Sequence, residues 1–143
     1  MTSENTNEHP DLLSMKTVIR TKDLEASKAF YTQLLELKTV EEYDDGDGAR
    51  GCIVRVGPEG STAFLELSEI AATHYYFKPA FHQSFLNDKA DIQIRTTAVS
   101  YWADRLKRHN WEARGPVLRP WGSHYLYLRD PDGLQLIIYE EKC

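Results

Sequence analysis

The sequence contains only two cysteines, Cys52 and Cys143, and no apolar run long enough to cross a membrane. Two isolated cysteines do not make a disulfide framework, so we expect Cys52 to be a small buried residue and the protein to be cytoplasmic. A membrane span needs roughly 18 apolar residues, whereas the longest apolar runs here have the length of a strand. Residues 1–14 lack the basic and apolar segments of a secretory signal, and their polar composition predicts a flexible tail.

Positive charge is also scarce, with 17 Lys and Arg residues against 22 Asp and Glu residues and a net charge of −5. Nucleic-acid binding usually needs a strongly basic face on a basic domain. The densest basic stretch, residues 105–119, begins in a predicted helix, where a solvated face is the simpler interpretation. We therefore expect neither nucleic acid nor a membrane among the partners.

Two segments have helical periodicity. Asp23 is a suitable N-cap for a helix that continues to about Leu35, and apolar residues recur at helical spacing over residues 97–109. Short segments rich in β-forming residues surround both helices, at residues 15–20, 38–43, 50–56, 61–67, 90–96, 111–118, 123–129 and 134–139. The order β-α-β-β-β occurs twice, with a spacing of about 75 residues, which indicates a duplicated unit.

This repeat divides the chain into four parts. Residues 1–14 form the tail, 15–68 the first module, 69–88 a linker and 89–143 the second module. The linker is unusually rich in rings between residues 74 and 82. Rings in an irregular segment need a surface to bury against, such as the open side of a sheet, a dimer interface or the mouth of a pocket.

Two motifs carry a family resemblance. Residues 21–31 read Thr-Lys-Asp-Leu-Glu-Ala-Ser-Lys-Ala-Phe-Tyr, and residues 127–136 read Tyr-Leu-Arg-Asp-Pro-Asp-Gly-Leu-Gln-Leu. Together with the repeat, they make the chain resemble the vicinal oxygen chelate superfamily, also called the glyoxalase/bleomycin-resistance/dioxygenase group. The resemblance implies an α+β fold of two βαβββ modules, whose curved mixed sheets surround a cavity, and commonly a homodimer.

The resemblance also implies where a metal would be held. In metal-dependent members four strands each supply one His or carboxylate ligand, and the matching positions here are Lys16, Glu66, Asp91 and Ile137. An ammonium group has no lone pair to offer, and isoleucine has no donor atom. We therefore expect no cofactor and no catalytic metal, although Glu66 and Asp91 leave room for weak binding of a divalent ion.

Strand alternation groups the polar residues near these positions, because residues i and i+2 share a face. If the implied geometry holds, these faces point into the cavity, and either a ligand or mutual ion pairs, such as Lys16 with Glu66 or Asp91, satisfy their charges. With two aromatic residues added, the expected ligand-binding residues are Lys16, Arg20, Glu66, Asp91, Gln93, Arg95, Trp121 and Tyr125.

Three functions stay open, and no residue is assigned a catalytic role. The pattern favours a metal-free small-molecule-binding protein of the bleomycin-resistance type, which sequesters or senses an anionic or aromatic ligand. The second is an enzyme: a divergent metal-dependent lyase or dioxygenase with a further ligand such as His124, or a metal-free acid–base catalyst that uses Glu66 with Lys16. The third is an accessory domain with a vestigial cavity. A fold-level resemblance does not identify the ligand.

Overall fold

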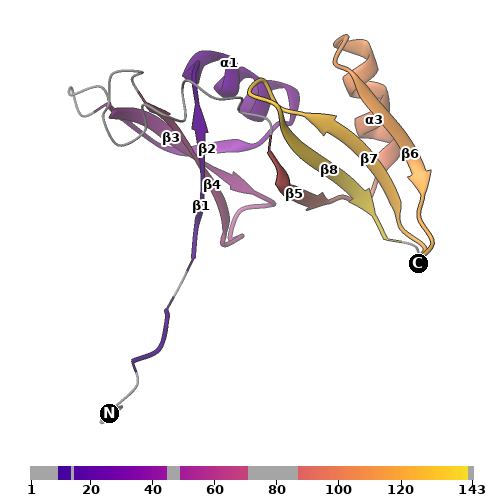
Figure 1. Cartoon of the computed structure of the whole chain (residues 1–143), viewed down its shortest axis with the longest axis horizontal. Helices are drawn as coiled ribbons and strands as arrows, with labels where there is room; N and C mark the ends of the chain where they lie inside the picture. The colour runs from indigo at the N-terminus through magenta and orange to yellow at the C-terminus, as the bar shows by residue number, and fades with distance from the viewer. Residues whose placement is uncertain (1–9, 14, 45–48, 71–86, 142–143) are drawn as a thin grey trace.

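The computed structural model describes residues 10–13, 15–44, 49–70 and 87–141. Within these ranges two modules follow one another along the chain, and Figure 1 labels their elements. The first module consists of β1 (Thr17–Thr21), α1 (Leu24–Lys28), η1 (Ala29–Leu34), β2 (Lys38–Asp44), β3 (Ala49–Val56) and β4 (Ala63–Ile70). The second consists of β5 (Asn87–Arg95), α3 (Val99–Arg108), β6 (Ala113–Leu118), β7 (His124–Arg129) and β8 (Leu134–Glu140).

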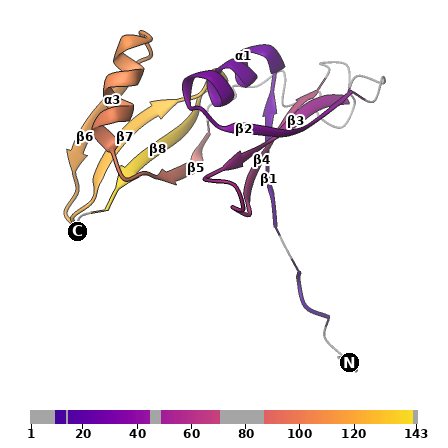
Figure 2. The ribbon, with the colours of Figure 1, turned by 180° about the vertical axis from the view of Figure 1, so that it is seen from behind.

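The two modules have the same sheet topology. Their strand orders are β1-β4-β3-β2 and β5-β8-β7-β6. In each sheet the first and last strands of the module pair in parallel, and the other neighbours pair antiparallel. Both sheets are curved, and each has helical turns on one side (Figures 1 and 2). The predicted α+β fold of two βαβββ modules is therefore confirmed.

The first helix begins at the predicted cap, because the Asp23 side chain accepts a hydrogen bond of 3.1 Å from a backbone N–H of the first turn. Its second half, η1, differs from the expected regular helix by winding in wider π-helical turns, in which the Leu35 N–H bonds to the Phe30 carbonyl. This winding accommodates two adjacent rings in the core, since Phe30 is 3% and Tyr31 is 0% exposed. The helical turns end at Leu34, and Glu36, two residues further on, has a φ of 61°.

The second helix and the strands agree closely with the sequence pattern. In α3, Val99 and Leu106 are buried and Trp102 packs against the core, as the periodicity predicts. All eight expected strands are present. The largest differences are at β4, which ends at Ile70 rather than residue 67, and at β5, which begins at Asn87 rather than residue 90.

The modules meet through their helical sides and share one hydrophobic core. The ring of Phe30 in η1 lies 5.0 Å from the ring of Trp111, which precedes β6. Beside this contact the Tyr31 hydroxyl donates a hydrogen bond of 2.8 Å to the Asp130 carboxylate, which follows β7. Strand residues on the helix-facing sides of both sheets, such as Leu67 and Leu126, are buried in this core.

Two further predictions concern the ring-rich linker and the N-terminal tail. The expected ring cluster around residues 74–82 and most of the expected tail lie outside the described residues. The described part of the N-terminal segment runs away from the body of the molecule (Figure 1), and Leu12, Leu13 and Met15 are 100%, 90% and 90% exposed. No helix of the described ranges is long and apolar enough to cross a membrane.

Candidate functional site on the open faces of the two sheets

Each sheet has one face toward the helices and an opposite face, which we call the open face. In β4 the side chains of Leu65 and Leu67 are buried in the core, so alternation turns Glu66, between them, to the open face. Lys16 precedes β1, and its ammonium nitrogen lies 2.5 Å from Oε1 of Glu66. Tyr43 of β2 donates a hydrogen bond of 2.7 Å to Oε2 of the same carboxylate. The structure thus pairs Lys16 with Glu66, one of its two expected partners.

Both oxygens of Glu66 are therefore engaged. Tyr43 reaches them across β3 at Gly51, where an added methyl group would collide with the tyrosine ring. The ammonium of Lys16, followed by the hydroxyl of Tyr43, holds the pKa of Glu66 below its ordinary value of 4.5. A carboxylate held ionised in this way is poorly suited to exchange protons near neutral pH.

The register of the two sheets shows which residues correspond. Glu66 lies opposite the β1 residue two positions after Lys16, and Ile137 lies opposite the β5 residue two positions after Asp91. The Lys16–Glu66 pair of the first module therefore corresponds to Asp91 and Ile137 in the second. These are the four positions at which the resemblance places metal ligands.

The residues at these positions do not fit a resident metal ion. Lys16 offers no lone pair and already occupies Glu66, and Ile137 is a buried hydrocarbon. Asp91 is then the only uncommitted oxygen donor, whereas a catalytic zinc site normally keeps three protein ligands. His124, the further ligand considered for an enzyme, is an exposed residue at the start of β7. Across the residues that the structure describes, no three His, Cys, Asp or Glu side chains come together.

Aromatic side chains cover the open face of the second sheet and form a group that we call the ring cluster. Its centre is Tyr125, whose ring centroid lies 5.5 Å from that of Trp121 and 5.8 Å from those of Tyr127 and Tyr139. The Tyr125 hydroxyl donates a hydrogen bond of 3.3 Å to the side-chain oxygen of Gln93. The cluster brings together three of the expected ligand-binding residues and adds Tyr127 and Tyr139.

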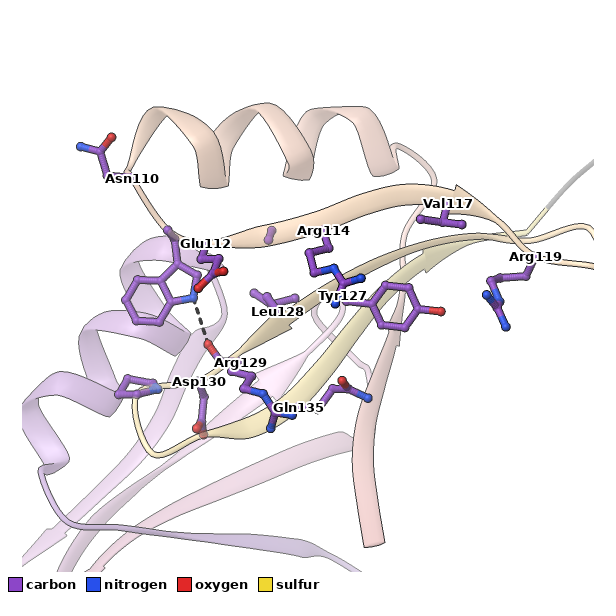
Figure 3. Close-up of a pocket in the computed structure, with 13 residues that line it drawn as sticks. Asn110, Glu112, Arg114, Val117, Arg119, Tyr127, Leu128, Arg129, Asp130 and Gln135 are labelled. Carbon is purple, nitrogen blue, oxygen red and sulfur yellow. Dashed lines mark hydrogen bonds between the residues drawn. The ribbon is translucent and has the colours of Figure 1, made fainter. Parts of the chain in front are cut away.

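An open hollow of about 950 Å³ lies next to the ring cluster, which we call the strand hollow. Arg114, Arg119 and Arg129 line it together with Tyr127 and Gln135, and Figure 3 shows these side chains along β6, β7 and β8. Because Tyr127 belongs to both features, the hollow and the ring cluster form one continuous surface. A hollow of this size accommodates a drug-sized molecule.

Two of the arginines that line the strand hollow, Arg114 and Arg119, form no ion pair with a described residue. The guanidinium of Arg119 lies 5.0 Å from the centre of the Trp121 ring, and its Nε is shielded from solvent with no hydrogen-bond partner among the described residues. Arg114 forms no ion pair or hydrogen bond with any described residue. Of the two carboxylates that line the hollow, Glu112 is exposed, and that of Asp130 is hydrogen-bonded in the core. An anionic group would therefore find unused donors here.

A bulge in β6 places Arg114 in this surface. Arg114 pairs with Tyr127 and Val117 pairs with Tyr125, although three positions separate Arg114 from Val117. Strict alternation would put residues three positions apart on opposite faces. Gly115, with a φ of 113°, absorbs the extra length. Sequence alternation alone therefore missed Arg114, and the Gly-Pro dipeptide at positions 115–116 was the signal for the bulge.

The eight expected ligand-binding residues fall into separate groups. Lys16 and Glu66 form the ion pair of the first open face, and Arg20 is close enough to lower the pKa of Glu66. Gln93, Trp121 and Tyr125 belong to the ring cluster of the second open face. Asp91 and Arg95 are exposed on β5, and Arg95 lines a second, smaller hollow. None of the eight lines the strand hollow itself.

Comparison with known proteins gives a family and a set of similar folds. The sequence model of the glyoxalase/bleomycin resistance protein/dioxygenase superfamily matches residues 15–138. No curated protein sequence matches the chain at a significant level.

Solved structures share the fold of this chain although less than a quarter of their residues are identical to it. TnmS3, an antibiotic binding protein from Streptomyces sp. CB03234, is 21% identical with a TM-score of 0.69, over 93% of this chain and 100% of that chain. Glyoxalase I of Leishmania major is 22% identical with a TM-score of 0.65, over 92% and 88%. FosX of Listeria monocytogenes, a fosfomycin resistance protein solved with Mn(II) and sulfate, is 12% identical with a TM-score of 0.65, over 94% and 95%.

Proposed function

The chain belongs to the glyoxalase/bleomycin resistance protein/dioxygenase superfamily, and from that premise we propose that it binds a small aromatic molecule with an acidic group, without a metal ion. Binding takes place at the strand hollow and the adjoining ring cluster. The protein then acts by sequestering or sensing its ligand rather than by transforming it.

The observation that carries this proposal is the pairing of uncompensated arginines with an aromatic wall. Arg119 holds an unused donor against Trp121, and Arg114 projects from the bulge beside Tyr127. A planar guanidinium binds a carboxylate, sulfonate or phosphate with two parallel hydrogen bonds. Aromatic rings at the same place would stack on a flat apolar body. TnmS3, which shares the fold, is an antibiotic binding protein, and this supports the proposal of a small-molecule ligand.

The metal-free part of the proposal rests on the ion pair of the first open face. The family chemistry needs several convergent donor groups, whereas Lys16 occupies Glu66 and Ile137 contributes none. The positive charge of Lys16 also stands where a cation would have to bind. The acid–base alternative is disfavoured by the same contact, because Glu66 and Lys16 neutralise each other.

A matched pair of probes tests the ligand class. We expect 2-naphthoate to bind in isothermal calorimetry and the neutral 2-naphthamide, which has nearly the same shape, to bind at least about tenfold more weakly. Arg114→Gln and Arg119→Gln should each weaken naphthoate binding about tenfold. Arg108→Gln serves as the control, because Arg108 is exposed on α3 and does not line the strand hollow. Equal binding of both probes, or unchanged binding by both hollow variants, would refute the proposal.

Metal analysis tests the other half. Protein purified without chelator and then dialysed should retain less than about a tenth of an equivalent of transition metal per chain, because catalytic sites need three protein ligands. If about one equivalent remains and Glu66→Ala removes it, the lyase or dioxygenase alternative takes the place of this proposal.

The proposal includes a cytoplasmic homodimer. The free thiol of Cys52, buried in the core, is compatible with a reducing compartment. Leu12, Leu13 and Met15 project from the body almost fully exposed, and in the proposed dimer the second copy covers them. Sedimentation at tens of micromolar protein should give about twice 16.5 kDa. A species of 16.5 kDa in the same experiment would contradict the dimer.

A further inference from the structure

A second hollow of about 290 Å³ lies where the two modules meet, and we call it the junction hollow. Its first-module side consists of the chain after η1 and the ends of β2 and β3 that lie near it. Its second-module side comes from the end of β5, from α3 and from β8. It shares no lining residue with the strand hollow, so it is a separate site.

Most of the wall of the junction hollow is apolar. Leu35, Leu37 and Val56 line it from the first module, and Ile94 and Ile138 line it from the second. The indole ring of α3 completes the wall. That ring belongs to Trp102, whose N–H already donates a hydrogen bond of 3.1 Å to the Thr96 hydroxyl, which leaves the ring itself as the contact surface.

The polar part of the wall is cationic. Lys38 and Arg55 lie directly opposite each other in the β2–β3 register, and like charges in that position destabilise a sheet. Arg95 lines the same hollow from β5. Among the described residues none of these three cations forms an ion pair or a hydrogen bond. The Nε of Arg55 is shielded from solvent and has no hydrogen-bond partner within the described part of the chain.

The one carboxylate of the lining does not compensate these charges. Glu36 accepts a hydrogen bond of 2.8 Å from the Tyr101 hydroxyl, and its Oε2 lies 3.1 Å from Nε of Arg105. Arg105 also donates to the Leu34 carbonyl at 2.8 Å, which fixes this contact on the outer side of η1. The junction hollow therefore combines apolar walls with a buried donor and an excess of positive charge.

We propose that the junction hollow binds a small organic monoanion, namely a carboxylate on a compact apolar or aromatic body. The carboxylate pairs with Arg55 and Arg95 and separates the facing charges of Lys38 and Arg55. The body packs against Trp102 and the aliphatic wall. A volume of about 290 Å³ is near the lower limit of small-molecule pockets, so the ligand has on the order of ten non-hydrogen atoms. Because the ligand contacts both modules, its binding also stabilises the fold.

The probe for this site is phenylacetate, with phenylacetamide as its neutral counterpart and inorganic phosphate as an anion without an apolar body. The readout is the indole N–H resonance of Trp102 in ¹⁵N-labelled protein, which is assigned by its loss in Trp102→Phe. We expect phenylacetate to shift this resonance saturably with a Kd of about 1 mM or tighter and to raise Tm. Phenylacetamide and phosphate should each bind at least about tenfold more weakly.

Variants separate this site from the strand hollow. Arg55→Gln should weaken phenylacetate binding at least about tenfold, and Arg95→Gln, at an exposed position, gives the same test should the first variant fold poorly. Arg108→Gln is the matched control. Shifts confined to Trp111 and Trp121 and abolished by Arg114→Gln would move the ligand to the strand hollow and overturn this proposal while supporting the other. Equal binding of phosphate, or no saturable shift of Trp102 at 10 mM phenylacetate (roughly ten times the expected Kd), would also overturn it.

Discussion

The two modules share two hydrogen-bond contacts at the starts of their helices, yet the chemistry of their open faces differs. In the first module the Thr21 hydroxyl accepts a hydrogen bond of 3.1 Å from the Asp23 N–H. In the second the Thr96 hydroxyl accepts one of 3.2 Å from the Ala98 N–H. Thr21 is the last residue of β1 and Thr96 directly follows β5, so a similar turn leads into each helix.

The last strand of each module contributes a second shared contact. Glu69 of β4 accepts a hydrogen bond of 2.8 Å from the Leu24 N–H, and Glu140 of β8 accepts one of 2.9 Å from the Val99 N–H. Each carboxylate binds an N–H group that the first turn of the helix leaves unsatisfied. The start of each helix is therefore held by a side chain of the preceding turn and by a side chain of the last strand of its module.

The open faces differ at every position that could bind a ligand. Glu66 with its ion pair corresponds to the hydrocarbon of Ile137, and Gly51, which lets Tyr43 pass, corresponds to Tyr125 at the centre of the ring cluster. The first face pairs Glu66 with Lys16, whereas the second gathers rings and leaves Arg114 and Arg119 without an ion pair to any described residue. The duplicated framework thus allows one face to be structural while the other is available for a ligand.

The largest expected effect concerns the hydrogen bond between Tyr31 and Asp130, which joins the modules. Asp130→Ala should lower the free energy of unfolding by about 3 kcal/mol, because the change leaves the buried Tyr31 hydroxyl and two turn N–H groups without an acceptor. Urea unfolding followed by circular dichroism measures this. Tyr31→Phe, which removes one of these bonds and no carboxylate, should have a smaller effect. A loss under about 1 kcal/mol for Asp130→Ala would show that the modules do not depend on this pair.

The next largest effect tests the contrast between Gly51 and Tyr125 by changing each residue. Gly51→Ala should lower the free energy of unfolding by about 2 kcal/mol, because the added methyl group would collide with the Leu67 carbonyl and the Tyr43 ring. Tyr125→Phe removes only a hydrogen bond of 3.3 Å and should change the stability by less than about 0.5 kcal/mol. Thermal unfolding of both variants compares their stabilities directly. Equal losses of stability would mean that Tyr43 does not need a glycine at position 51 to reach across β3.

Much of this comparison follows from the sequence, because alternation and helical periodicity are local. They predicted the duplicated strand order and the buried face of α3, and the shared face of Lys16 and Glu66 followed once the family geometry was added. The arginines of the strand hollow were missed for a physical reason. Arg114 depends on a bulge at Gly115, and Arg119 depends on a turn that returns it to Trp121. Alternation assumes a regular strand, so it does not place side chains that follow a bulge or a turn.

The same limit applies to the junction between the modules. Tyr31 and Asp130 each belong to a recognisable motif, but their mutual hydrogen bond depends on how the two modules pack. The two positive charges of Lys38 and Arg55 likewise face each other only because of the register of β2 and β3. The order of the framework elements was therefore predictable from local pattern, whereas the candidate sites were predicted only in part, with Gln93, Trp121 and Tyr125 in the ring cluster and Arg95 at the junction hollow.

A smaller effect is expected from substitutions that make the N-caps of the two helices alike. Asp23 caps α1 through its side chain, whereas Ala98 at the start of α3 makes no such bond. Asp23→Ala should lower the free energy of unfolding by about 1 kcal/mol, and Ala98→Asp should raise it by up to about 1 kcal/mol. Chemical denaturation measures both. If Ala98→Asp gives no gain, the contact from Glu140 already saturates the start of α3.

The smallest effect is a difference in pH dependence between the modules. Lys16, and then Tyr43, lower the pKa of Glu66 below its ordinary 4.5, so its contribution to stability is present above about pH 4.5 and is lost as the pH falls through the lowered value. Burial raises the pKa of Asp130 above its ordinary 3.8, so its linked contribution has the opposite sign and declines as the pH rises through the raised value. Lys16 is 60% exposed, and solvent screening limits its pair with Glu66 to less than about 1 kcal/mol. Denaturation at pH 7 should therefore show Glu66→Gln slightly less stable than the natural protein, and the gap should close near pH 3. A gap that persists unchanged at the lower pH would mean that Glu66 stabilises the first sheet through packing and not through its charge.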